Sequence, residues 1–479
     1  MTAVSRLAPR ASQIDPRRRQ WLLLIVLFVA SLPAVTTRIY SSDEIQYFAY
    51  LRSAWFDRDL SFENEYRYFY DRGIAKSEGF HETFLERTTA TGRRINFGTV
   101  GCAILWAPFY AAGHIVARAS GAPVDGFSRP YVAAVAYGSA LYGFLAIALA
   151  VLAARRLGLD ASRGALAVWL GTPLLFYMYV APPFSHACSA FSVALFVYIW
   201  LRVRDEWSVR GLAALGAAGA LMAMVREQDA FFVVGPALDF LWTAARGRTA
   251  SGLRKAAHGH WTAVLAAAVA FGAVFALQAA TYVRLNGHVG PHASVARKMN
   301  WAAPHALQVL FSPEHGFFVW TPLALIALAG LLFLPAEAGS HTASVASGFS
   351  RKWQVALCLI AMVLLQIYVG GSVESWTVAG AFGQRRFVAL TAIMVIGYAA
   401  ADTAIRAWSR EARWILMAVT ILMVYWNLAL TAEFATGLMD RQKLEPRRNL
   451  YDAFVTLPAE APSLIYRYLF DRASFYKHR

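Results

Sequence analysis

Apolar runs of about 17 to 25 residues recur along the chain, separated by short polar segments. A helix of this length crosses the hydrocarbon core of a bilayer. The pattern therefore predicts an all-α polytopic membrane protein, with about eleven transmembrane helices and interfacial helices in its first outer loop. The predicted spans cover residues 21–37, 130–154, 163–182, 187–203, 211–225, 229–244, 261–283, 316–334, 353–370, 386–402 and 414–432.

The basic residues predict how these spans are oriented. Residues 1–20 form a basic N-terminus, and Lys and Arg favour the cytoplasmic side, so this end is expected inside and the C-terminus outside. Residues 38–129 then form the first outer loop. Within it, 97–117 is apolar but interrupted by Gly, Pro and His. A full crossing there would put Arg155 and Arg156 outside, so we expect this segment to lie on or dip into the outer leaflet.

The composition agrees with a membrane protein and narrows its partners. Of 479 residues, 58% are hydrophobic and only 15% are charged, whereas a soluble chain of this size carries more charge. The net charge is +16, but the basic residues concentrate in short loops between spans, which points to anionic lipid and not to nucleic acid. Cys102, Cys188 and Cys358 lie in apolar stretches and match no disulfide or zinc spacing.

An acidic pair, Asp43 and Glu44, follows the first span almost at once, in the stretch SSDEIQYF (41–48). Ser41 and Glu44 match a capping box, and an acid suits the positive end of a helix dipole. This structural interpretation accounts for one acid and leaves the second unexplained. An acid held at the membrane surface is also a good general base for a substrate that arrives from water. Both interpretations stay open on the sequence alone.

Two arginines, Arg385 and Arg386, stand at the outer end of a predicted span, in ESWTVAGAFGQRRF (374–387), where the positive-inside rule disfavours them. Either they reach lipid phosphates at the interface, or they bind the phosphate of a substrate through paired, charge-assisted hydrogen bonds. Gly380 and Gly383 would allow the backbone to approach a ligand closely.

Further polar candidates fall on the same predicted face. The histidines of the outer loop 284–315 match no strong metal motif, so no metal site is expected. The spans themselves are nearly free of polar residues, whereas a transporter needs them near the mid-plane. One-sided polar chemistry therefore indicates an enzyme at the outer leaflet. The additional candidates are Arg226, Glu227, His186, Arg297, Lys298, Glu374 and Trp376, with Tyr47 on the predicted helix after Asp43.

The order of these features resembles that of the GT-C glycosyltransferases: one span, an outer loop opening with SSDEIQYF, an interfacial segment, then many further spans. The chain is similar in particular to the branch of protein O-mannosyltransferases and aminoarabinose transferases of lipid A, which share Asp-Asp or Asp-Glu in that loop. The resemblance implies four parts: a basic N-terminus (1–20), a catalytic membrane module (21–245), variable C-terminal helices (246–432) and a short outer tail (433–479).

The resemblance also implies a reaction. Asp43 would be the catalytic base, and the donor a sugar on a polyprenyl phosphate, transferred with inversion to a hydroxyl of a glycan, lipid or protein. Glu44 would orient Asp43 or bind the acceptor. No cofactor or metal is expected, because a lipid monophosphate needs less charge neutralisation than a nucleotide pyrophosphate. The residues expected to bind the donor phosphate are Arg385, Arg386, Arg226 and Lys298, and those expected to bind substrate are Tyr47, Glu227, His186, Arg297, Glu374 and Trp376.

The expected location is the bacterial cytoplasmic membrane, with the site on its periplasmic or extracellular side. Two rival functions remain open from the sequence. One is an O-antigen polymerase or ligase, which also acts on lipid-linked sugars outside but lacks an acidic pair after the first span. The other is a transporter of lipid-linked sugar.

Overall fold

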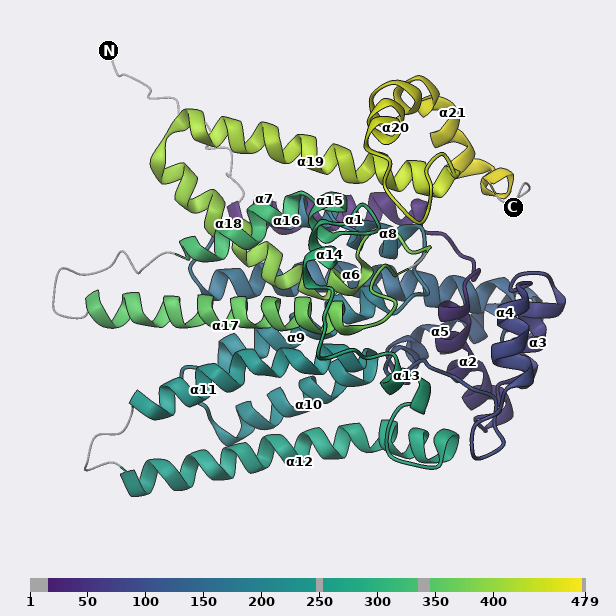
Figure 1. The fold of residues 1–479 in the computed structure, drawn as a ribbon, viewed down its shortest axis with the longest axis horizontal. Coiled ribbons are helices and arrows are strands. Elements are labelled where there is room, and N and C mark those ends of the chain that lie inside the picture. Colours follow the sequence, from purple (N-terminus) through teal and green to yellow (C-terminus); the bar gives the residue numbers. More distant parts are fainter. Residues whose placement is uncertain (1–15, 247–252, 335–344, 379, 476–479) are drawn as a thin grey trace, which may run out of the picture.

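The computed structural model describes residues 16–246, 253–334, 345–378 and 380–475. These residues form helices joined by loops, with two isolated β-bridges and no longer strands among them. The long helices run side by side through the molecule, and short helices of the first loop cover one end of this bundle (Figure 1). The first 15 residues of the basic N-terminus lie outside the described residues.

The helices follow the predicted spans closely. Their bounds are α1 (Pro16–Ser31), α2 (Ser42–Arg52), α3 (Glu63–Asp71), α4 (Glu78–Phe80), α5 (Gly101–Ser120), α6 (Arg129–Arg156), α7 (Ser162–Gly171), α8 (Leu174–Tyr179), α9 (His186–Val203), α10 (Val209–Val225), α11 (Val234–Arg246), α12 (Leu253–Asn286), α13 (Ala293–Arg297), α14 (Ala306–Phe311), α15 (Phe317–Trp320), α16 (Leu323–Ala329), α17 (Val345–Ser372), α18 (Thr391–Trp408), α19 (Arg410–Thr436), α20 (Pro446–Tyr451) and α21 (Leu457–Phe470).

Six of the described helices are long and apolar enough to cross a bilayer: α6, α9, the outer part of α12 from Trp261, α17 from Lys352, α18 with its preceding turn, and α19. The chain is therefore a multi-pass, all-α membrane protein, as predicted. The other predicted spans coincide with shorter helices or with helix pairs such as α7 and α8. Eleven spans remain a prediction.

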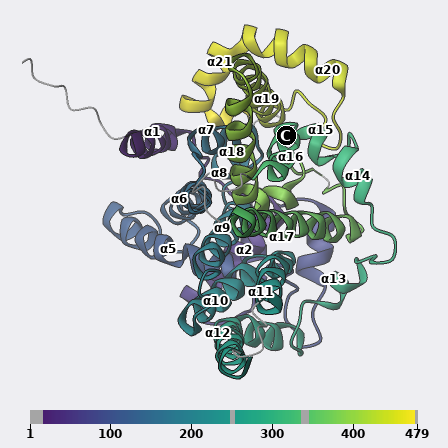
Figure 2. The ribbon, with the colours of Figure 1, turned by 90° about the vertical axis from the view of Figure 1, so that its left-hand side faces the viewer.

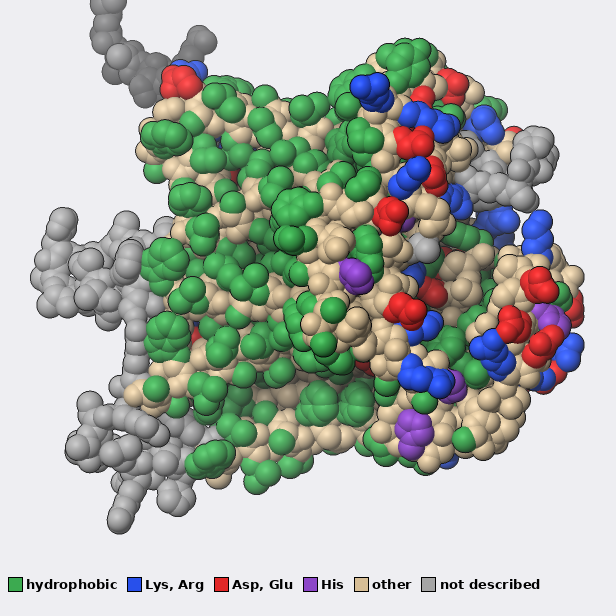
Figure 3. Space-filling model, viewed as in Figure 1, with side chains coloured by type: hydrophobic (Ala, Val, Ile, Leu, Met, Phe, Trp, Pro, Cys, Tyr) green, Lys and Arg blue, Asp and Glu red, His purple; other side chains and the backbone are tan. Residues whose placement is uncertain are grey.

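The surface divides in the way that a membrane protein requires. On the face shown in Figure 3, hydrophobic side chains cover the bundle, and charged side chains gather towards the end where α2, α3 and α4 lie. In the end-on view α6, α9 and α12 are seen along their axes, whereas α5 is seen from its side (Figure 2). The segment 97–117 thus runs across the bundle, and its place at the membrane interface stays a prediction.

Close backbone contacts at glycine hold the long helices together. A Cβ on Gly397 of α18 would lie 1.9 Å from the carbonyl oxygen of Ala327 in α16, and one on Gly216 of α10 would lie 2.1 Å from that of Ala267 in α12. Small residues at helix crossings let backbones approach, which is how helices pack tightly within lipid.

One span departs from the expectation of nearly non-polar spans. Asp239 of α11 is fully buried and accepts hydrogen bonds from Arg204, Trp200 and Gln354, at distances of 2.6–3.0 Å. This cluster ties α9, α11 and α17 together. The sequence alone does not reveal the partners of Asp239, because they come from other helices.

Candidate active site

The first turn of α2 separates the roles of the two neighbouring acids. Ser41 is the N-cap, and its hydroxyl accepts from the Glu44 backbone N–H at 3.4 Å. Glu44 Oε2 accepts in return from the backbone N–H groups of Ser41 (3.0 Å) and Tyr40 (2.9 Å). The predicted capping box is therefore confirmed, with Glu44 as its acid.

Glu44 is enclosed by protein. Its side chain is fully buried, and burial raises its pKa to about 8 against the opposing effect of its two backbone hydrogen bonds. At neutral pH the protonated form is thus favoured, and this carboxyl adds little negative charge beside Asp43. The structural interpretation accounts for Glu44, which leaves Asp43 as the acid that faces outward.

Asp43 meets an arginine from the far end of the chain. Arg385 Nη1 donates to Asp43 Oδ2 at 2.6 Å, across 342 residues of sequence. The side chain of Asp43 is 37% exposed and that of Arg385 is 22% exposed, so a ligand from solution can reach the pair. Gly383, in the left-handed region at φ 58°, makes the turn before Arg385, and a Cβ there would lie 2.9 Å from the ring of Pro173. The Arg385 guanidinium also lies 5.7 Å from the centre of the Phe184 ring.

A second arginine stands beside this pair. Arg226 donates to His186 Nδ1 and, through Nη2, to Gln228 Oε1 at 3.1 Å. Because arginine is only a donor, His186 Nδ1 accepts, and its proton sits on Nε2. That Nε2 is buried and has no hydrogen-bond partner within the described part of the chain. His186 therefore offers an unused N–H donor next to two arginines.

Tyr47 connects the two halves of the site. It lies one turn after Asp43 on α2, and its ring meets Trp106 edge to face at 6.5 Å. Burial raises its pKa, while the nearby charge of Arg226 acts in the opposite direction. A Cβ on Gly101 would lie 2.4 Å from the backbone of Met224, so α5 packs directly against the end of α10 that leads to Arg226.

Arg386, the neighbour of Arg385, points elsewhere. It is nearly buried, and its guanidinium donates to the backbone oxygens of Ser375 (3.0 Å) and Trp376 (3.5 Å). The Gln366 side-chain amide of α17 donates to the backbone carbonyl of Arg386 at 2.9 Å. Its hydrogen bonds therefore secure the loop before it, although its charge still acts on Arg385 and on His186.

The remaining predicted residues lie around this centre. Arg297, Lys298 and Glu374 are exposed, and the backbone N–H of Glu374 donates to the Lys298 carbonyl at 2.7 Å. The centres of the Trp376 and His305 rings lie 5.5 Å apart, with the rings tilted. Within the described ranges, none of these four predicted residues forms a hydrogen bond with Asp43. Glu227 accepts from Tyr282, and burial raises its pKa to about 7.

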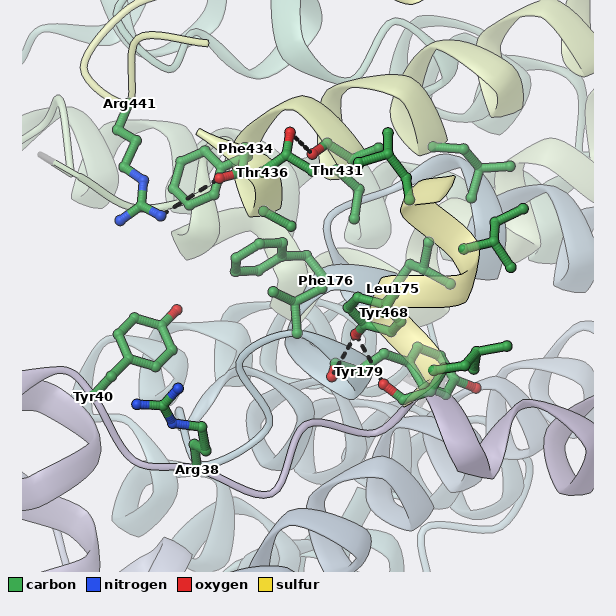
Figure 4. Close-up of a pocket in the computed structure, with 18 of the residues that line it drawn as sticks. Arg38, Tyr40, Leu175, Phe176, Tyr179, Thr431, Phe434, Thr436, Arg441 and Tyr468 are labelled. Carbon is green, nitrogen blue, oxygen red and sulfur yellow. Dashed lines mark hydrogen bonds between the residues drawn. The ribbon is translucent and has the colours of Figure 1, made fainter. Parts of the chain in front are cut away.

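The structure also shows residues that the sequence did not single out. Tyr177 of α8 binds the backbone of Phe382 through its hydroxyl, at 3.1 Å and 3.2 Å, and so supports the turn that leads to Arg385. A cavity of about 720 Å³ lies beside the Asp43 cluster without including it (Figure 4). Arg38 lines this cavity. The available signal in the sequence was a basic residue five positions before Asp43, on the predicted outer side, where the positive-inside rule disfavours it.

No described group of three His, Cys, Asp or Glu side chains comes close enough together to hold a metal ion. The expected absence of a metal stays a prediction. What the geometry provides is one reachable carboxylate, two arginines and an unused histidine N–H.

Sequence comparison with family models and with curated proteins finds no match. Comparison with solved structures does. The chain is similar to ArnT from Cupriavidus metallidurans, crystallised with undecaprenyl phosphate, at 14% identity and a TM-score of 0.53, covering 96% of this chain and 78% of that one. A weaker likeness, at 13% identity and a TM-score of 0.43, links it to the oligosaccharyltransferase AglB from Archaeoglobus fulgidus, covering 96% and 56%. The similarity to ArnT confirms the predicted fold: this chain is a multi-pass membrane protein with the GT-C fold.

Proposed function

We propose that this protein is an inverting glycosyltransferase that moves a sugar from a polyprenyl phosphate to an acceptor hydroxyl, at the outer face of a bacterial cytoplasmic membrane. The observation that carries the proposal is the reachable Asp43–Arg385 pair at the start of α2. Its support is the GT-C fold, together with the undecaprenyl phosphate bound in the ArnT structure.

The reaction uses these groups in order. Asp43 takes the proton of the acceptor hydroxyl, and the oxygen attacks the anomeric carbon through a transition state with oxocarbenium character. The bond from that carbon to the phosphate oxygen breaks, and its electron pair leaves with the lipid phosphate. Arg385 and Arg226, with His186 Nε2–H, stabilise the charge that develops there. Fixed donors in a site that excludes water do this best, because they need no reorganisation.

The other predicted residues take supporting roles in this proposal. Arg386 keeps the loop before Arg385 in place and adds positive potential. The exposed Arg297 and Lys298 draw anionic substrates towards the site. Tyr47 lies near enough to both Asp43 and Arg226 for their charges to act on it, and we propose that it contacts the sugar.

The test is the fate of a labelled donor. Purified protein in detergent is given a polyprenyl phosphate that carries a radiolabelled sugar, with and without a cell-envelope lipid extract as acceptor. Transfer predicts release of free polyprenyl phosphate and a new labelled product. A protein that binds the donor but leaves it intact under all conditions would contradict the proposal and favour a carrier.

A further inference from the structure

A buried histidine with a strained backbone lies behind the turn that leads to Arg385. His315 ends the predicted outer loop 284–315 and is fully buried. Its φ is 65°, in the left-handed region, which glycine adopts freely but which costs free energy for a residue with a Cβ. The backbone N–H of His315 donates to the Pro313 carbonyl at 3.0 Å. Strained residues of this kind cluster at functional sites, where the surrounding structure holds them.

The side chain of His315 forms a platform with Trp320. The two rings stack with their centres 4.7 Å apart and an angle of 18° between their planes. The indole N–H of Trp320 donates to the Pro313 carbonyl at 3.0 Å, which fixes the indole. Trp320 also meets Phe382 edge to face, with the ring centres 5.8 Å apart. The platform therefore extends to the segment 380–385, which we call the Arg385 turn.

The Arg385 turn contacts His315 itself at two points. The Gln384 side-chain amide donates to the His315 carbonyl at 3.4 Å. The Ala381 backbone lies close enough to the His315 ring to act on its pKa. Arg385 follows directly, and its backbone N–H donates to the Gly383 carbonyl at 2.9 Å. A change in the platform would therefore be passed on to Arg385.

The imidazole of His315 is neutral at neutral pH. Burial lowers its pKa to about 4 against the opposing effect of the Ala381 backbone, and the charge of Arg385 acts in the same direction as burial. The ring thus carries one N–H and one lone pair. Both ring nitrogens are buried, and neither has a hydrogen-bond partner within the described part of the chain. A phenyl ring would fill the same place without burying unpaired polar atoms, so stability alone does not favour histidine here.

We propose that His315 is a positioning residue for Arg385 in the transfer reaction. Through the Arg385 turn it keeps the Arg385 guanidinium where it meets Asp43, at 2.6 Å, and the leaving phosphate. The polar ring acts on the nearby Ala381 backbone, which a phenyl ring cannot do. This inference rests on the proposed function. His315 acts through Arg385 alone and takes no part in the bonds that form and break.

The first experiment measures turnover in His315→Phe, which keeps a ring beside Trp320 and removes both nitrogens. Full-length protein in detergent is given the radiolabelled donor, with the substitution made in wild type and in Arg385→Ala. We expect kcat to fall at least tenfold in His315→Phe, with KM for the lipid donor changed less than twofold. In Arg385→Ala the same substitution should change kcat less than twofold, because the group that it positions is already absent. His315→Asn tolerates the left-handed backbone and restores an N–H, so it should recover part of the loss.

A second measurement does not depend on turnover. Phenylglyoxal modifies accessible guanidinium groups, and peptide mass spectrometry counts the modification at Arg385. We expect Arg385 to be modified at least threefold faster in His315→Phe than in wild type, because its pair with Asp43 is held less well. The matched control is His288→Phe, at an exposed histidine of the same predicted outer loop. It should leave both kcat and the modification rate unchanged.

Four results would each overturn the inference. They are a kcat in His315→Phe within twofold of wild type, an equal fold loss with and without Arg385, no recovery in His315→Asn, and an unchanged rate of Arg385 modification. If His315→Phe does not fold, His315→Gln takes its place under the same criteria; if neither folds, His315 serves stability and the inference is wrong. Wild-type protein that binds undecaprenyl phosphate but never cleaves the labelled donor contradicts the proposed function. The modification rate then decides separately whether His315 positions Arg385.

Discussion

Two acidic clusters in this molecule differ in how completely their hydrogen bonds are satisfied. Asp239 accepts four bonds, two from Arg204 and one each from Trp200 and Gln354, and is fully buried. Within the described part of the chain Asp43 has one ion-pair partner, Arg385, and its side chain is 37% exposed. A saturated polar cluster inside a membrane protein fastens helices together. An unsaturated one that solvent can reach still has bonding capacity for a ligand.

The same contrast separates adjacent residues. The Arg386 guanidinium donates to backbone carbonyls. The Arg385 guanidinium, among the described residues, donates to the reachable Asp43 carboxylate and lies near the Phe184 ring. Glu44 satisfies the end of a helix, whereas Asp43 beside it does not. Sequence proximity therefore says little about which member of a pair is functional, and the number of fixed partners says much more.

The largest effect is expected from the orientation of the protein, because the two clusters are predicted to lie towards opposite sides of the membrane. We predict that Ser61→Cys is labelled completely by an impermeant maleimide in whole cells, and that Asp205→Cys is labelled only after lysis. The three native cysteines are buried and give little background. Labelling of Asp205→Cys but not of Ser61→Cys in whole cells would show that the protein has the opposite orientation, and would contradict the proposed mechanism.

The next largest effect is expected at Asp239. Asp239→Asn leaves Arg204 without its counter-charge in a buried place, and breaking such a pair costs on the order of 3–5 kcal/mol. We expect a clear fall in melting temperature or in yield of folded protein. Turnover per folded molecule should stay within about twofold of wild type. A stable Asp239→Asn protein with lost transfer would reverse the roles assigned to the two clusters.

Arg385 should show the opposite pattern, with a smaller free-energy change. Loss of a charge-assisted contact to the donor phosphate costs about 1.5–3 kcal/mol. Arg385→Ala is therefore expected to lower kcat/KM for the lipid donor roughly ten- to a hundredfold. Arg385→Lys should recover only part of it, since lysine lacks the paired donors. Arg386→Ala should also lower the melting temperature, which Arg385→Ala should not, because Arg386 holds the loop at Ser375. Equal losses of stability in the two alanine variants would contradict these separate roles.

The smallest effect is expected at Glu44, and it concerns pH. Its pKa is about 8 in the folded protein against 4.5 for a free side chain, so between these values the folded state holds a proton that the unfolded chain releases. Glu44 therefore makes stability fall as pH rises from about 4.5 to about 8. Glu44→Gln keeps the capping box and should flatten the melting temperature over this range, with transfer reduced less than in Asp43→Asn. An unchanged pH profile would show that Glu44 is ionised in its buried place.

Much of the fold follows from sequence, and the site follows only in part. Apolar runs predict the spans because their length is set by the bilayer, and Ser41–Glu44 predicts its own cap because the partners are three residues apart. The predicted topology puts Asp43 and Arg385 on one face of the membrane, but their contact depends on how α2 and the turn before α18 pack. The cavity of Figure 4 is less visible still in the sequence, since its walls combine α8, α19 and α21 with the segment after α1.

Turnover of Asp43→Asn with the labelled donor decides whether Asp43 is the base. Asparagine keeps the shape of the side chain and its capacity near a helix N-terminus but removes its basicity. We expect Asp43→Asn to fold with a native melting temperature and native affinity for undecaprenyl phosphate, and to transfer sugar about 10²- to 10⁴-fold more slowly. Asp71→Asn, at the exposed end of α3, is the matched control and should leave transfer unchanged. A stable Asp43→Asn protein that transfers sugar at the wild-type rate would show that Asp43 is not the base.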